Sequence, residues 1–230
     1  MASEPSLKRF LLLAGFVLAI AGVATFAAWQ YYSKRVPGQR QATSESLPIL
    51  GDVPAFALTS FDGTQVTRES LAGKVWVADF IFTTCGGLCP IMTNAMAGVQ
   101  DAARKAGLGP DDLRLVSVST DPETDTPERL RAYAEQHRAR TEQWHFLRGP
   151  FDQVQSFSQD ALKLALERAS EKQRAEGAEK IMHSDRFVLV DRESRIRGFY
   201  SGTRPSEVRQ LIEDLPRLVA EGPAKAGASK

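Results

Sequence analysis

The chain is poor in the residues on which disulfide scaffolds, metal clusters and nucleic-acid-binding proteins depend. It has two cysteines, three histidines and a formal net charge of +1 in 230 residues. Two cysteines cannot build a disulfide framework, and a chain of this length buries enough core to fold without one. The balanced charge provides no basic surface for nucleic acid, and no repeat of solenoid period is visible. With 43% hydrophobic and 25% charged residues, the composition is that of a globular protein.

The N-terminal segment contains a long run without charge. Residues 10–29 read FLLLAGFVLAIAGVATFAAW, and at about 1.5 Å per residue such a helix spans a hydrocarbon core of about 30 Å. Lys8 precedes the run, Trp29 ends it, and Tyr31 and Tyr32 follow it, as in an interfacial aromatic belt. We therefore expect an N-terminal transmembrane helix that anchors the chain through residues 1–32.

A cleaved signal peptide is the alternative, because AIA at residues 19–21 is a possible cleavage site. Both interpretations place the bulk of the chain outside the cytoplasm. Residues 33–49 are polar and aperiodic, which indicates a linker, and residues 221–230 indicate a disordered tail. The folded domain is therefore predicted over residues 50–220.

Strand and helix signals alternate through this domain. Strands are predicted around a turn within residues 55–67 and over residues 75–82, 113–120, 144–149, 187–191 and 196–202. Helices are predicted over residues 90–107, 125–137, 150–166 and 205–219. This order predicts an α/β fold, a mixed sheet flanked by helices on both faces.

Both cysteines follow the apolar strand at residues 75–82, in the stretch TTCGGLCPIM. The proline after Cys89 is expected to open a helix, whose N-terminus would lower the pKa of the Cys89 thiol. The two glycines after Cys85 permit positive φ, so the loop can close a disulfide in the metal-free chain or hold the sulfurs around an ion. Two buried cysteines acting as small hydrophobes are the alternative, which the glycines and the helix start disfavour.

A metal site would need a third ligand, and the three histidines are the candidates. His137 ends a charged helix, His145 lies at a strand start, and His183 lies just before the strand at residues 187–191. From the residues alone, a solvated or structural role fits each of them better than a ligand role. His183 could reach the thiols if the strand that follows it neighbours the central strand.

Acidic residues in two segments have open roles. Asp79 interrupts the apolar strand, and because a buried carboxylate needs partners, it either serves the thiols or fills a polar gap. Asp121, Glu123 and Asp125 form an acidic loop that faces a partner or caps the next helix. Thr126 is expected to cap that helix, with Pro127 at its first position, and among the acidic residues we prefer a capping role for Asp125.

Several stretches together resemble the Sco/SenC family of membrane-anchored copper proteins, which have a thioredoxin-like domain and help assemble the dinuclear copper centre of cytochrome c oxidase. DFIFTTCGGLCPIM looks like the family's strand and Cys-x-x-x-Cys-Pro, and VSVSTDPETDTPERLRAYA looks like its strand, acidic loop and helix. MHSDRFVLVDRESRIRGFYSG is similar to the segment that supplies a histidine. The resemblance implies a thioredoxin-like fold, a single-pass inner-membrane anchor with the domain on the periplasmic side, and Cys85, Cys89 and His183 as copper ligands.

Two positions depart from the family pattern. Many members have a histidine where this chain has Thr84. The charged segment at residues 167–180 has no fixed counterpart, and we interpret it as a solvated helix or a flap beside the site.

Two thiolates and one imidazole are a soft donor set suited to Cu(I) and able to hold Cu(II), whereas structural zinc would want a fourth ligand. We therefore expect a copper chaperone that is not an enzyme. Its expected partner is the copper-bearing subunit of cytochrome c oxidase or another copper chaperone. The alternative is a thiol–disulfide oxidoreductase that reduces the cysteines of the partner's copper site. Loss of His183 should separate the two, because dithiol exchange needs only the cysteines.

Overall fold

The structure is a computed structural model with two compact units, residues 1–45 and residues 46–230. It describes residues 11, 15, 20–27, 30, 46–175 and 181–222. In the first unit the described residues are helical, with residues 20–27 the longest stretch. Most of the predicted anchor, nearly all of the linker and the tail from residue 223 lie outside the described residues. No helix within the described ranges is both long and apolar enough to cross a bilayer.

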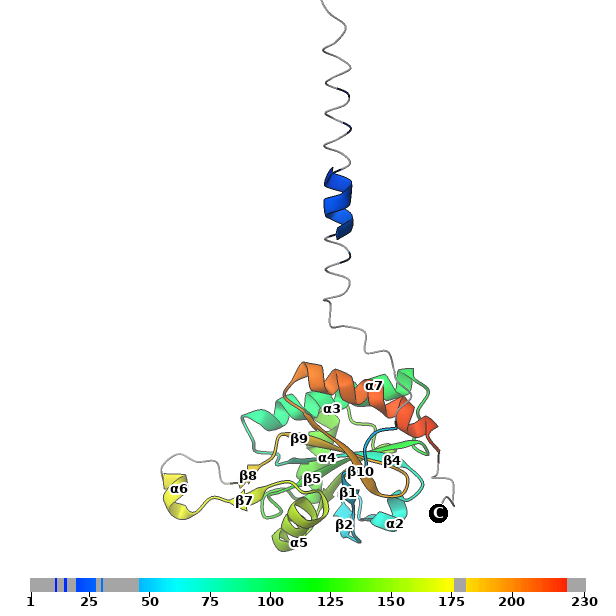
Figure 1. The fold of residues 1–230 in the computed structure, drawn as a ribbon. Helices are drawn as coiled ribbons and strands as arrows, with labels where there is room; N and C mark the ends of the chain where they lie inside the picture. Colours follow the sequence, from blue (N-terminus) through cyan, green and yellow to red (C-terminus); the bar gives the residue numbers. More distant parts are fainter. Residues whose placement is uncertain are drawn as a thin grey trace, which may run out of the picture. The chain divides into compact units, whose positions relative to one another are not determined.

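The second unit is built around an eight-stranded mixed sheet with the order β1-β10-β9-β4-β5-β6-β2-β3 (Figure 1). Its strands are β1 (Gly51–Asp52), β2 (Ala57–Ser60), β3 (Gln65–Thr67), β4 (Val75–Ile81), β5 (Leu113–Ser119), β6 (Trp144–Arg148), β9 (Arg186–Val190) and β10 (Arg195–Ser201). Strands β4, β5 and β6 are parallel, and β9 runs antiparallel to β4. A separate hairpin pairs β7 (Leu166–Arg168) with β8 (Ile181–His183). The predicted mixed sheet is confirmed.

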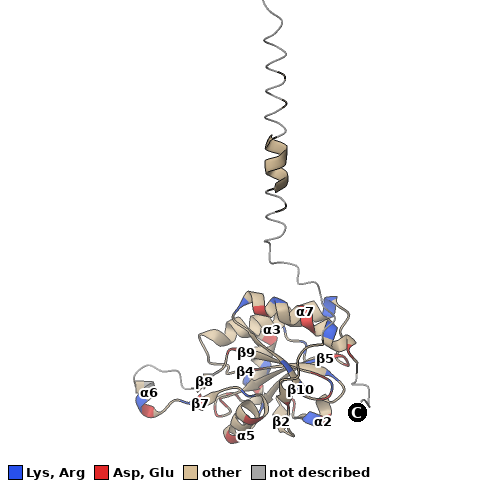
Figure 2. Cartoon of the chain, viewed as in Figure 1, with Lys and Arg blue, Asp and Glu red and all other residues tan. Residues whose placement is uncertain are grey.

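Helices cover both faces of this sheet. The helices of the unit are α2 (Arg68–Leu71), α3 (Leu88–Lys105), α4 (Pro127–Gln136), α5 (Phe151–Ser156), α6 (Glu171–Ala175) and α7 (Pro205–Ala220). Helices α3 and α7 lie side by side over one face, and α5 lies on the other (Figure 1). Both α6 and α7 carry charges of both signs (Figure 2), which agrees with the balanced composition.

Strand β4 separates the two layers of the core. Its odd-numbered apolar residues, such as Val77 and Ile81, pack in the cluster that contains residues of α3, α4 and α7. Its even-numbered residues, Trp76, Ala78 and Phe80, pack in the cluster that contains residues of α5. The whole strand is buried, which explains its nearly unbroken apolar run, because side chains on both faces are shielded from water.

One predicted helix is much shorter than expected. The helix predicted over residues 150–166 ends as α5 at Ser156 and continues only as a π-helical turn over Phe157–Ala161. Leu162, Leu164 and Leu166 are then buried at every second position, which is the spacing of a strand. The helical prediction was wrong here because the apolar residues at its end follow a period of two.

The topology brings three loops to one edge of the sheet. Because β4 and β5 are parallel, the cysteine loop (residues 82–87) and the acidic loop (residues 121–125) both leave from their carboxyl ends. Strand β9 is antiparallel to β4, so the chain between β8 and β9, residues 184–185, enters at the same edge. The strand that follows His183 therefore neighbours the central strand, which is the condition stated above for His183 to reach the thiols.

Candidate functional site

The two cysteines lie at the carboxyl end of β4. The backbone N–H of Cys85 donates to the carbonyl of Phe82 at 3.2 Å, which turns the chain directly after the strand. Cys85 is half-buried, whereas Cys89 is fully buried in the first turn of α3. Both residues are present as thiols rather than as a disulfide. Cys85 is therefore the sulfur that an incoming reagent meets first.

The prediction of a lowered pKa for Cys89 is wrong. Burial raises the pKa of this thiol above its ordinary value, and the neighbouring Cys85 thiol raises it further, while a backbone hydrogen bond with Phe82 acts in the opposite direction. Removal from water outweighs the helix N-terminus because the Cys89 side chain is 0% exposed. Cys89 therefore keeps its proton at neutral pH in the metal-free chain.

Helix α3 begins two residues earlier than predicted, with Gly87 as its N-cap residue. The positive φ that the two glycines permit is found at neither Gly86 nor Gly87. An added Cβ at either glycine would meet no atom within 4 Å, so the space beside the cysteine loop is open at these positions.

A buried hydroxyl pair fixes the first turn of α3 to α4. Thr93 Oγ1 donates to the carbonyl oxygen of Cys89 at 2.8 Å, and Tyr133 Oη lies 2.7 Å from the same Thr93 oxygen. Since Thr93 has a single hydroxyl proton, Tyr133 is the donor in the second bond. The backbone of the buried cysteine is therefore tied to a neighbouring helix.

Asp79 lies on the face of β4 that is turned toward α3. Its Oδ1 accepts a hydrogen bond from Ser117 Oγ at 2.6 Å, and Trp144 Nε1 donates to the same hydroxyl at 2.9 Å. Within the described residues, Asp79 Oδ2 has no hydrogen-bond partner. Burial raises the Asp79 pKa to about 7, against the opposing effect of the Ser117 hydrogen bond. The Asp79 charge also raises the pKa of Cys89, so the carboxyl group is electrostatically coupled to the thiols.

Asp125 does not cap α4, so the capping role preferred for it is wrong. Thr126 is the cap, as predicted, and its Oγ1 accepts from the Arg129 N–H at 3.3 Å. The Asp125 side chain is 0% exposed and turns toward the cysteine loop. Its two oxygens each lie 3.2 Å from the backbone nitrogen of Thr83, and they accept the hydroxyls of Thr83 and Ser119 at 2.5 Å each. The acidic loop therefore holds the residue two positions before Cys85.

The β7–β8 hairpin carries His183. In its register Leu166 lies opposite His183 and Arg168 lies opposite Ile181. Leu166 and Ile181 are 0% and 2% exposed, so the base of the hairpin belongs to the core. The side chain of His183 lies outside the described part of the structure, and its approach to the sulfurs stays a prediction. Among the side chains that are described, no three of His, Cys, Asp or Glu converge as a metal site.

The segment at residues 167–180 belongs to this hairpin. It continues β7 and contains the short helix α6, which lies at the far end of the projecting hairpin (Figure 1). Residues 176–180 lie outside the described residues.

The other two histidines lie on elements away from the cysteine loop. His137 follows α4, where its Nδ1 lies 3.0 Å from Asn94 Oδ1 and its ring centroid lies 4.5 Å from that of Tyr133. His145 is the second residue of β6, toward the amino end of the strand, and burial lowers its pKa. Both are half-buried structural residues.

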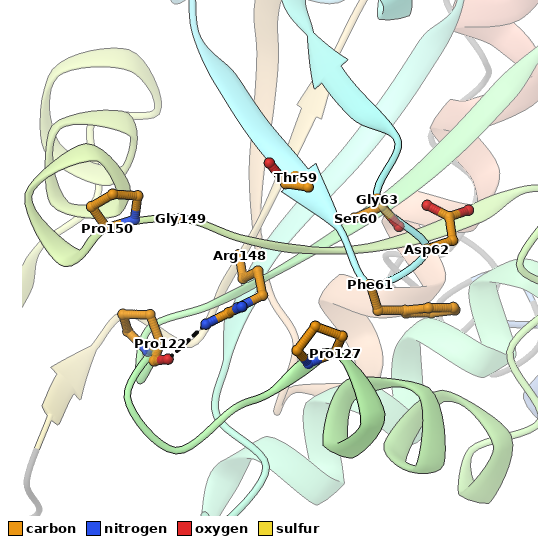
Figure 3. A pocket seen from close by; sticks show the side chains of 10 residues that line it. All are labelled: Thr59, Ser60, Phe61, Asp62, Gly63, Pro122, Pro127, Arg148, Gly149 and Pro150. Atoms are coloured by element: carbon orange, nitrogen blue, oxygen red, sulfur yellow. Dashed lines mark hydrogen bonds between the residues drawn. The ribbon is translucent and has the colours of Figure 1, made fainter.

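A cavity of about 640 Å³ lies on the other side of the acidic loop (Figure 3). Phe61, Pro122 and Pro127 contribute to its lining, and Arg148 Nη2 donates to the carbonyl of Pro122 at 2.9 Å. Neither cysteine lines this cavity. It is therefore separate from the thiol site, although one loop borders both.

Sequence reasoning found the thiols and missed the residues that support them. Thr83 and Arg168 make the contacts that orient the cysteine loop and the hairpin. Their partners lie 42 and 45 positions away along the chain, and no local pattern encodes such pairs.

Comparison with known proteins agrees with this arrangement. The family model described as SCO1/SenC matches residues 51–220. The SCO1 protein homolog of Bacillus subtilis is 31% identical over 169 residues, which cover 73% of this chain and 83% of the homolog. The solved structure of BsSco, described as a member of the Sco family of cytochrome c oxidase assembly proteins with a disulfide switch, has 30% identity and a TM-score of 0.65, covering 76% of this chain and 98% of that one.

A more distant structure shares the fold. ScoI from Bradyrhizobium japonicum, solved with copper bound, has 24% identity and a TM-score of 0.58, and the match covers 73% of this chain and 99% of that one. The thioredoxin-like fold implied by the sequence resemblance is thus confirmed. A family match across nearly the whole folded unit, with the cysteine pair at the carboxyl end of the central strand, shows that the chain belongs to the SCO1/SenC family.

Proposed function

We propose that the chain is a copper chaperone that helps to metallate the dinuclear copper centre of cytochrome c oxidase. Copper is its cargo, and Cys85, Cys89 and His183 are its proposed ligands. The observation that carries the proposal is the topology of the sheet, which places the cysteine loop and residues 184–185, directly after His183, at the same edge. The family's connection with cytochrome c oxidase assembly and the copper-bound ScoI structure support it.

The donor chemistry fits this cargo. Sulfur and imidazole donors favour Cu(I), and three of them leave room for a partner's ligand during transfer. The half-buried Cys85 can make the first contact with copper, and the buried Cys89 must then release its proton for the ion to bind.

The decisive experiment measures Cu(I) affinity of the full-length chain by competition with a colorimetric chelator. We expect His183→Ala to lower the affinity at least 10- to 100-fold, the loss typical of residues that only support a ligand. The matched control is His145→Ala, which removes a half-buried histidine from β6 and should bind copper like the wild type. A His183→Ala chain that holds copper as tightly as the wild type would contradict the proposal.

The second candidate function is a thiol–disulfide oxidoreductase. It is favoured by the proximity of the thiols, since Cys85 raises the Cys89 pKa through hydrogen bonding and charge, and by the disulfide switch described for BsSco. In this reaction the two thiols lose two protons and two electrons and form a disulfide, while the partner's disulfide gains them and becomes two thiols.

An assay of disulfide-peptide reduction separates this function from copper binding. His183→Ala should still reduce the peptide although it loses copper affinity, whereas Cys85→Ser should not reduce it. Complete alkylation of both cysteines in air-oxidised, metal-free protein would show that the loop does not close, and would remove the basis for the oxidoreductase.

We propose further that residues 1–32 anchor the chain in the inner membrane, with the folded unit on the periplasmic side. The uncharged run at residues 10–29 and its aromatic border support this location. N-terminal sequencing of the mature protein tests it, because a chain that begins near Gly22 would show a cleaved signal peptide instead.

A further inference from the structure

The acidic loop touches both halves of the proposed copper site. At one end, the buried carboxylate of Asp125 accepts the backbone N–H and the hydroxyl of Thr83, two residues before Cys85. Ser119 Oγ also donates to this carboxyl group, which therefore accepts hydrogen bonds from two elements at once. Such a carboxylate fixes the geometry of its donors, because each bond lost leaves a buried acceptor unsatisfied.

At the other end, the acidic loop holds the hairpin that carries His183. Arg168 Nη1 on β7 donates to Glu123 Oε1 at 2.9 Å. The Arg168 guanidinium also lies 4.0 Å from the ring centroid of Phe151, at the start of α5. The two contacts fix one side chain between an anionic and an aromatic partner, and Arg168 lies in the strand that pairs with His183.

The loop between these two contacts is compact and braced. The backbone N–H groups of Thr124 and Asp125 both donate to the carbonyl of Asp121, at 3.1 and 2.8 Å. Arg148 on β6 donates to the carbonyl of Pro122 (Figure 3). These hydrogen bonds connect the backbone of the loop from Asp121 to Asp125, between the residue that contacts Arg168 and the residue that contacts Thr83.

We propose that the acidic loop is a bracket that positions the two halves of the site. Asp125 sets the cysteine loop through Thr83, and Glu123 sets the His183 hairpin through Arg168. The identity of the bound ion rests on the proposed function, whereas the contacts of the acidic loop with the cysteine loop and the hairpin do not. The test therefore has two experimental arms, one for each contact, and each arm includes one measurement with copper and one without it.

The first arm compares Thr83→Val with Thr83→Ser. Valine keeps the shape and loses the hydroxyl donor, and serine keeps the donor. We expect Thr83→Val to lower Cu(I) affinity about tenfold and to speed alkylation of Cys85 in copper-free protein about threefold, because a lost hydrogen bond to a buried charged acceptor loosens the loop. Thr83→Ser should stay within about twofold of the wild type in both assays.

Thr126→Ala is the control for this arm. It removes the cap of α4 and so lowers stability without touching Thr83. Its Cu(I) affinity and Cys85 alkylation rate should match the wild type. Equal effects of Thr126→Ala and Thr83→Val would assign the changes to global stability and overturn this arm, as would a Thr83→Val chain that behaves like the wild type.

The second arm uses Arg168→Gln, Glu123→Gln and the double variant. Amide hydrogen exchange in β7 and β8 of the copper-free chain should become about threefold to tenfold faster in each single variant. The double variant measures the coupling between the two residues, and a coupling energy near zero would contradict the link between Glu123 and Arg168. Cu(I) affinity should fall in parallel, while disulfide formation between the cysteines should not change.

Arg104→Gln is the control for this arm, since it removes an exposed ion pair with Asp101 on α3. It should leave exchange in the hairpin unchanged. Unchanged exchange in Arg168→Gln would overturn the bracket even if His183→Ala abolishes copper binding. A wild-type chain that binds no copper would refute the proposed cargo, and the alkylation and exchange data would still decide the bracket.

Discussion

Asp79 is a carboxyl group whose folded environment opposes its ionisation. Its pKa rises from 3.8 to about 7 because the side chain is buried, with one hydrogen bond from Ser117. The protonated form is thus favoured by folding. The stabilisation from protonated Asp79 is fully present below about pH 4 and is lost as the pH rises through about 7. Each pKa unit corresponds to about 1.4 kcal/mol, so the loss amounts to a few kcal/mol.

We therefore expect Asp79→Asn to be more stable than the wild type at pH 8 and to lose this advantage at pH 4, because asparagine accepts the Ser117 hydrogen bond without ionising. Urea titrations of the reduced, metal-free chain at both pH values measure the difference in unfolding free energy. Asp62→Asn is the control. Hydrogen bonding lowers the pKa of that carboxyl, so this substitution should lower the unfolding free energy more at pH 8 than at pH 4. A stability difference that does not change with pH would contradict the prediction.

At the scale of elements, the turn between β10 and α7 packs tightly against α3. The backbone N–H of Gly202 donates to the carbonyl of Asp185 at 2.8 Å. A Cβ at Gly202 would lie 2.8 Å from Phe187 Cζ and 3.2 Å from Met92 Cγ. Since Phe187 and Met92 are fully buried, neither side chain can move without disturbing the core near Cys89.

Gly202→Ala should therefore lower the unfolding free energy by about 1–3 kcal/mol, as overpacking does. Gly109→Ala is the matched control, because an added Cβ there meets no atom within 4 Å, and it should stay within about 0.5 kcal/mol of the wild type. Denaturant titration of both variants measures the effect. Equal stability of the two would show that the turn yields to the added methyl group.

At the scale of the whole molecule, copper binding should be visible as thermal stability, because a ligand that binds only the folded chain stabilises it. At a free Cu(I) concentration 100-fold above the dissociation constant, the gain is about 2.7 kcal/mol. For a chain of this size that corresponds to a rise in Tm of about 5–10 °C.

This shift should shrink strongly in His183→Ala and disappear in Cys85→Ser, measured by scanning calorimetry with and without Cu(I) under reducing conditions. Thr126→Ala lowers the starting Tm through the α4 cap but should keep the full shift. A shift of the same size in His183→Ala would mean that the cysteines alone hold the ion.

The sequence by itself determined the features that depend on neighbouring residues. Strand β4 could be predicted because every one of its side chains is buried, and the start of α4 could be predicted because Thr126 and Pro127 form a local cap. The cysteine pair and its place after a buried strand could be predicted because they lie in one continuous stretch of sequence. The family resemblance could be recognised because each of its motifs is contiguous.

Only the tertiary structure decided the properties that depend on burial and on distant partners. The helix start suggested a lowered pKa for Cys89, and complete burial reversed the direction. Asp125 stands where a cap is expected, yet its partner is Thr83, 42 positions earlier. The helix predicted up to residue 166 ends at Ala161, and the chain then leads into strand β7 at Leu166, because the leucines at alternate positions pack on the core. Desolvation and long-range hydrogen bonds are set by which surfaces meet, and local sequence patterns do not specify that.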